Sequence, residues 1–124
     1  MSFSHTLTYF VKVKKNRTIL TFGEIIRDQR ESMNLSIRDV AIQINIDPSL
    51  LGKIERNERL PTNEQIELLA EYLKLNLNYL KITAISDQVV YKVLETSNQM
   101  EILKVAEKKV KYLKKPKRVF DSFS

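Results

Sequence analysis

Apolar residues recur every three or four positions from Phe22 almost to the carboxyl end of the chain, which is the period of an amphipathic α-helix. The 124 residues include only 2 Gly and 3 Pro, so the chain has few of the turn residues that many short strands require. A chain of this length suits one small domain with appendages. We therefore expect an all-α protein.

Helix start signals divide this pattern into five short helices. Thr21 with Glu24, and Thr62 with Gln65, have the spacing of capping boxes. Asn45 predicts a tight break between two helices, because Asn adopts the left-handed conformation more easily than most residues. The residues expected to cap the five helices are Thr21, Ser36, Asp47, Thr62 and Asn76. Pro48 follows the third cap, at the first helical position where proline is favoured.

The pattern changes after residue 82, and we predict a helical hairpin over residues 83–116, whose second helix ends before Pro116. Its apolar face is too short for an independent coiled coil. It is wide enough to pack on the core or on a second subunit, so we expect a homodimer. The candidate dimerisation residues are Val89, Val90, Val93, Leu94, Leu103, Ala106, Val110 and Leu113.

Residues 1–20 differ from the rest and form a separate amino-terminal arm. Apolar and polar residues alternate from Leu7 to Lys14, which is the period of a β-strand. A lone strand has no partner in a helical domain. A short hairpin with a return strand near residues 18–20, pairing across a dimer, and disorder all remain open. Residues 117–124 form a basic tail.

The net charge of +6 is concentrated at the two ends of the chain. Residues 1–21 carry four basic residues and no acidic one, and residues 108–124 carry seven and one. Residues 22–80 carry seven basic and ten acidic residues. Basic ends suit a polyanionic partner through counterion release. Their other interpretation is solubility alone.

Several functions lack the residues that they need. The chain has no Cys and one His, His5, so a disulfide, a thiolate metal site and a Ser-His-Asp triad are excluded. No Gly-rich phosphate loop is present, and we expect neither an enzyme nor a cofactor or metal site. Neither a membrane span nor a secretory signal is visible, so we expect a cytoplasmic protein without membrane contact.

The stretch from Ser36 to Asn57 carries the functional hypothesis. It predicts two helices joined by a turn too short to let them lie side by side, which is the geometry of a helix-turn-helix. The second helix of such a pair can enter the major groove of DNA. Tight helix pairs also occur in small helical bundles that bind no DNA.

Phe22–Leu80 resembles the helix-turn-helix family of the Cro and lambda-repressor type, the XRE family. The most specific block is Leu51-Gly52-Lys53-Ile54-Glu55-Arg56-Asn57, followed by Arg59-Leu60-Pro61-Thr62, and the block Leu35-Ser36-Ile37-Arg38-Asp39-Val40-Ala41 precedes it. The resemblance implies a five-helix lambda-repressor-like DNA-binding domain over residues 21–82. It also implies a double-stranded DNA operator as the partner.

The resemblance assigns roles to individual residues. Arg30 and Glu55 correspond to an ion pair that clamps the recognition helix to the first helix. Gly52 suits either a close approach to DNA or close helix packing. Gln residues found in many relatives are absent, and Asn57 stands where Gly is usual. The residues placed where the family reads base edges are Pro48, Ser49, Gly52 and Lys53, and those placed where it touches phosphates are Arg38, Arg56, Asn57 and Arg59. Ile37 and Leu50 complete the residues placed at DNA.

Two functions remain open. The first is a dimeric transcriptional regulator, a repressor or a controller, for instance of a restriction-modification or methyltransferase operon. The second is the antitoxin of a toxin–antitoxin pair, in which the carboxyl-terminal helices bind a toxin. The apolar surface of residues 87–113 fits either function.

Overall fold

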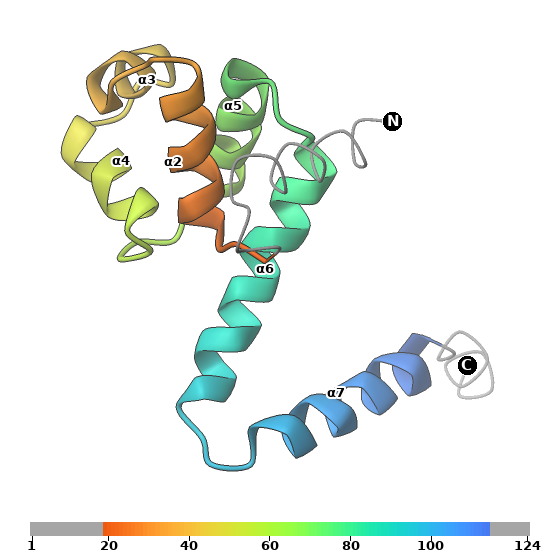
Figure 1. Cartoon of the computed structure of the whole chain (residues 1–124). Helices are drawn as coiled ribbons and strands as arrows, with labels where there is room; N and C mark the ends of the chain where they lie inside the picture. Colours follow the sequence, from red (N-terminus) through yellow and green to blue (C-terminus); the bar gives the residue numbers. More distant parts are fainter. Residues whose placement is uncertain (1–18, 115–124) are drawn as a thin grey trace. The chain divides into compact units, whose positions relative to one another are not determined.

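The computed structural model describes residues 19–114, and within this range it contains helices and turns but no strand. The strand predicted over residues 7–14 and the basic tail lie outside the described residues. The chain divides into two units, one ending at Asp87 and the other beginning at Gln88. The helices, labelled in Figure 1, are α2 (Phe22–Ser32), α3 (Ile37–Gln43), α4 (Pro48–Glu55), α5 (Asn63–Leu73), α6 (Leu77–Leu94) and α7 (Gln99–Lys114).

The first five of these helices begin where their N-caps predict, and the N–H of Tyr79 donates to Oδ1 of the cap Asn76 at 2.7 Å. The capping boxes at Thr21 and Thr62 are both confirmed, because each hydroxyl accepts from the third helical N–H and each third side chain accepts from the cap N–H. Ser36 forms a further capping box with Asp39. Asp47 caps α4 by accepting a hydrogen bond from the N–H of Ser49.

Asparagine ends three of the helices, which explains how the chain manages with so little glycine. Asn34, Asn45 and Asn57 have φ values of 58°, 60° and 62°, the left-handed conformation that usually favours Gly. After each Asn, the next N–H donates back to a carbonyl in the last turn of the helix, as in a Schellman motif. The break predicted at Asn45 is confirmed.

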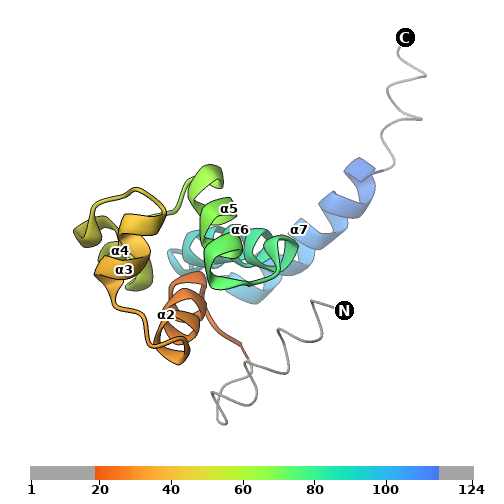
Figure 2. The same cartoon turned by 90° about the horizontal axis from the view of Figure 1, so that it is seen from above.

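Helix α2 is central to the first unit. It packs against α4 on one side and α5 on the other, and α3 packs against α4 (Figures 1 and 2). The Nε2 of Gln29 donates to the main-chain carbonyl of Leu73 at 2.7 Å, which ties α2 to the end of α5. The largest fully buried side chains are Ile25, Ile26, Val40, Leu51, Ile54, Leu69, Leu73 and Leu80.

The fifth helix is longer than the sequence predicted. The sequence pattern predicts a boundary after residue 82, but α6 has no break there and runs for 18 residues, from Leu77 to Leu94. Residues 81–94 contain neither Gly nor Pro, and Thr83 and Ala84 are buried in the first unit, so nothing stops the helix there. Asp87 accepts a hydrogen bond from the N–H of Phe22 at 2.7 Å, and its burial raises the pKa of its carboxyl group.

The second unit contains the last turns of α6 and all of α7. Val93 is buried, whereas no residue of α7 is buried. The second helix of the predicted hairpin starts at Gln99 and is described to Lys114, close to the expected bounds. No helix between residues 19 and 114 combines the length and the apolar character needed to cross a membrane.

The arm and the domain meet at a different residue from the one expected. Leu20 was placed in the arm, but only 6% of it is exposed and it belongs to the core of the first unit. The strand-like alternation of residues 7–14 drew Leu20 into the arm, although an apolar residue directly before an N-cap often packs against the fourth residue of the helix, which here is Ile25.

We expect Leu20→Ala to lower the free energy of unfolding by about 2 kcal/mol, because it leaves a cavity in the core. The matched control is Ile19→Ala, since Ile19 is 86% exposed and its truncation should change stability by less than about 0.5 kcal/mol. Urea unfolding followed by circular dichroism measures both. Equal effects of the two variants would contradict the burial of Leu20.

Candidate nucleic-acid interface

Helices α3 and α4 are joined by the short segment from Ile44 to Asp47. The N–H of Ile46 donates to the carbonyl of Ala41 at 3.0 Å, which closes the end of α3, and Asp47 starts α4 at once. Because this turn is too short to let α4 lie alongside α3, the two helices cross. This is the predicted helix-turn-helix geometry.

Helix α4 has a buried face and an exposed face. Leu51, Ile54 and Glu55 are buried. Ser49 and Lys53, four positions apart and therefore on one side of the helix, are exposed. Pro48 is also exposed, so the amino-terminal turn of α4 is open to a ligand.

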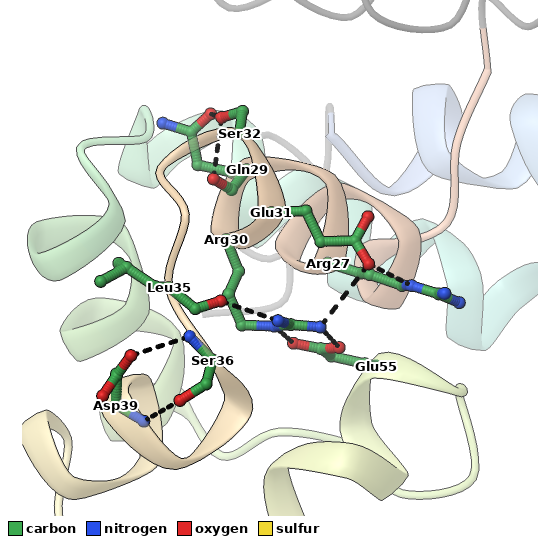
Figure 3. A network of polar contacts seen from close by, with 9 residues as sticks. All are labelled: Arg27, Gln29, Arg30, Glu31, Ser32, Leu35, Ser36, Asp39 and Glu55. Atoms are coloured by element: carbon green, nitrogen blue, oxygen red, sulfur yellow. Dashed lines mark hydrogen bonds and ion pairs between the residues drawn. The ribbon is translucent and has the colours of Figure 1, made fainter.

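The ion pair between Arg30 and Glu55 is present and bidentate (Figure 3). The Nε of Arg30 donates to Oε2 of Glu55 at 2.7 Å, and its Nη2 donates to Oε1 at 3.0 Å. Arg30 is 9% and Glu55 6% exposed. Hydrogen bonding of the guanidinium to the carboxylate of Glu55 raises the pKa of Arg30. Two parallel bonds fix the relative orientation of α2 and the end of α4.

The same guanidinium also holds the loop that precedes α3. Its Nη1 donates to the carbonyl oxygen of Leu35 at 2.9 Å, next to the Ser36 and Asp39 capping box (Figure 3). Hydrogen bonds from Ser36 lower the pKa of Asp39, so this cap is charged at neutral pH. Arg30 thus connects α2, the start of α3 and the end of α4.

The structure places the remaining predicted DNA-contact residues on two kinds of surface. Arg38 in α3 and Arg59 after α4 are exposed, whereas Ile37 and Leu50 are half-buried against the core. Gly52 is buried, and a Cβ added there would lie 3.2 Å from Nη1 of the flexible Arg56 side chain and 4.0 Å, an ordinary contact distance, from Cδ1 of Ile37. Neither neighbour requires a glycine, so both interpretations of Gly52 stay predictions.

Two predicted phosphate contacts have partners within the protein that the sequence did not predict. The Nε of Arg56 donates to Oε2 of Glu58 at 3.1 Å on the surface, with both side chains more than half exposed. A pair of this kind contributes little and can yield to another anion. The side chain of Asn57 bonds to the start of α2. Among residues 19–114, no group of acidic or histidine side chains could hold a metal ion.

Residues 26–80 match the protein-family model described as helix-turn-helix. This part of the chain is therefore similar to helix-turn-helix domains, in agreement with its resemblance to the XRE type. Domains of this class bind DNA with the second helix of the pair, and transcription regulators use them for that purpose.

Individual proteins that resemble this chain have low sequence identity to it or match only part of its length. An uncharacterised protein of Haemophilus influenzae is 34% identical over 64 residues, which are 52% of this chain but 21% of that protein. The chain thus spans about a fifth of the length of that relative. The crystal structure of the clp gene regulator ClgR from Corynebacterium glutamicum is 19% identical, with a TM-score of 0.47, and the match covers 69% of this chain and 86% of that one. The SinR protein/SinI protein complex gives 18% identity and a TM-score of 0.46, with 74% and 98% covered.

We expect Glu55→Ala to lower the free energy of unfolding by about 3 kcal/mol, because it leaves the guanidinium of Arg30 buried without its carboxylate. Replacing both partners with Met should restore most of this loss, since neither charge is then buried. Denaturant unfolding measures each variant.

The control is Glu31→Ala, which removes an exposed carboxylate 4.0 Å from Arg30 and should change the stability by less than about 0.5 kcal/mol. A Glu55→Ala variant as stable as Glu31→Ala would show that the buried pair does not hold α4.

Proposed function

We propose that the protein is a cytoplasmic, sequence-specific transcriptional regulator that binds a double-stranded DNA operator as a dimer. The match of residues 26–80 to the helix-turn-helix family model supports DNA binding and a non-catalytic role. The observation that carries the proposal is that α4 is fixed at one end and exposed at the other. Its carboxyl end is held by a buried bidentate ion pair, while its amino-terminal turn is exposed.

The exposed side of α4 has the chemistry for reading base edges. Ser49 can bond to several bases, and Lys53 can donate to O6 and N7 of guanine. The helix amino-terminus itself favours an anion, so a phosphate can approach it. Arg38, Arg56 and Arg59 flank this side and are exposed, and we assign them to the phosphates of the operator.

We expect Lys53→Ala to weaken binding to the preferred sequence by ~1–3 kcal/mol and to relax the preference at one base pair. The preferred sequence is first selected by the wild-type protein from a random DNA pool. The affinity of each variant is then measured on that duplex and on versions changed at single positions.

The matched control is Lys81→Ala, which removes the same charge from α6 in the same unit. This change should weaken binding only slightly and equally on every duplex. An equal loss on all sequences with Lys53→Ala would place Lys53 at a phosphate. Failure of the wild-type protein to enrich any sequence would refute the proposed function.

The dimer part of the proposal is supported by the apolar surface of the second unit. Val89, Val90 and Leu94 at the end of α6 are about half exposed, and so are Val110 and Leu113 in α7. Ala106 is exposed and Leu103 half-buried, and only Val93 in this set is buried. A second copy that covers this surface forms a twofold symmetric contact.

We expect the Val90→Glu, Val110→Glu double variant to be a monomer, because two carboxylates cannot be buried in an apolar interface. Gln88→Glu adds a carboxylate at an exposed polar position of α6 and should remain a dimer. Sedimentation equilibrium at one protein concentration measures all three proteins.

A double variant as dimeric as the wild type would exclude this surface from the dimer. A wild-type monomer would exclude the dimer itself and favour the antitoxin alternative, in which a toxin covers the same apolar residues. A methyltransferase or nuclease encoded beside the protein would support the controller role.

A further inference from the structure

The residue that ends α4 also bonds to the first turn of α2. Asn57 has a left-handed backbone, with its N–H bonded to the carbonyl of Ile54 at 3.1 Å. Its Oδ1 accepts a hydrogen bond from the N–H of Gly23 at 3.1 Å. Its Nδ2 donates to Oγ1 of Thr21 at 3.0 Å. Both polar atoms of this exposed side chain are therefore used inside the protein.

This contact requires a glycine on the α2 side. A Cβ added to Gly23 would lie 2.6 Å from the carbonyl oxygen of Ile54 and 2.7 Å from Oδ1 of Asn57, and it would also collide with the carbonyl of Glu55. These obstacles include main-chain atoms, so they cannot rotate away. The absence of a side chain at Gly23 lets the end of α4 rest directly on the start of α2.

The other amide groups at the start of α2 already have acceptors. The N–H of Thr21 donates to Glu24, that of Phe22 to Asp87, and that of Glu24 to Thr21 Oγ1. The N–H of Gly23 bonds to Asn57. Loss of the Asn57 side chain would leave this partly buried donor without that acceptor, and α4 would lose its second attachment.

The two attachments are separated along α2. Arg30 holds Glu55 near the end of α2, and Gly23 holds Asn57 at its start, seven residues and therefore about 10 Å away along the helix axis. Together with the buried side chains of Leu51 and Ile54, these two contacts fix the direction of α4 against α2. The direction of α4 decides which bases its exposed turn can reach.

We propose that Asn57 is a positioning residue for DNA recognition. By bonding to the first turn of α2 it fixes the direction of α4, and it does not contact a phosphate. This inference rests on the proposed function, because the direction of α4 affects recognition only if α4 binds DNA. It gives Asn57 a different role from the phosphate contact that the family resemblance implies.

Two substitutions separate the two roles. Asn57→Gly keeps the left-handed backbone and removes both side-chain bonds. Asn57→Asp keeps an acceptor for the N–H of Gly23, and a carboxylate is favoured at a helix amino-terminus. The same carboxylate would be repelled if it faced a phosphate. Asn34→Gly is the control, because Asn34 ends α2 with the same left-handed backbone.

The measured quantity is selectivity, the affinity for the duplex selected by the wild-type protein divided by the affinity for an unrelated duplex. General repulsion by an added charge affects both duplexes and cancels in this ratio. We expect Asn57→Gly to lower the selectivity by roughly tenfold, the equivalent of one to two net hydrogen bonds. Asn57→Asp should retain most of it, and Asn34→Gly all of it.

Hydrogen exchange of the Gly23 amide in the protein without DNA tests the contact itself. Exchange should become faster in Asn57→Gly and remain slow in Asn57→Asp. Selectivity unchanged in Asn57→Gly, or lower in Asn57→Asp than in Asn57→Gly, would overturn the positioning role while DNA selection by the wild type still stood. If the wild type selects no sequence, the proposed function fails first, and the recognition role of Asn57 falls with it.

Discussion

The buried pair between Arg30 and Glu55 is the interaction on which the arrangement of the first unit depends. A guanidinium offers several donors in one plane, and here they reach the end of α4 and the loop before α3 from one point on α2. Such a pair adds little net stability, because both charges lose their water. Its contribution is orientation, because it fixes the angle at which α4 crosses α2.

Much of this unit follows from local rules in the sequence. The capping residues Thr21, Ser36 and Thr62 fix where helices begin, because their hydroxyls satisfy free amide groups within three residues. Asn45 marks the turn for the same local reason. Where no stop signal exists, as along residues 81–94, local rules give no boundary, and the length of α6 depends on packing.

The functional residues were harder to predict, because their environments depend on partners far along the chain. Asn57, for example, bonds to residues 34 and 36 positions away in the sequence. A sequence pattern assigns such residues by type alone, so an Asn next to a recognition helix is read as a phosphate ligand. Only the close approach of α2 and α4 at Gly23 reveals its alternative partner.

Because α7 has no buried residue, its helical structure depends on what covers its apolar side. A helix of 16 residues with no buried side chain is marginal in water, since helix nucleation is costly and propagation gains little per residue. Any partner that covers its apolar side also supplies the free energy that keeps it helical. In the proposed dimer, folding of this segment and assembly become one equilibrium governed by concentration. The helical content of the protein would then rise with its abundance, which circular dichroism across a dilution series would detect.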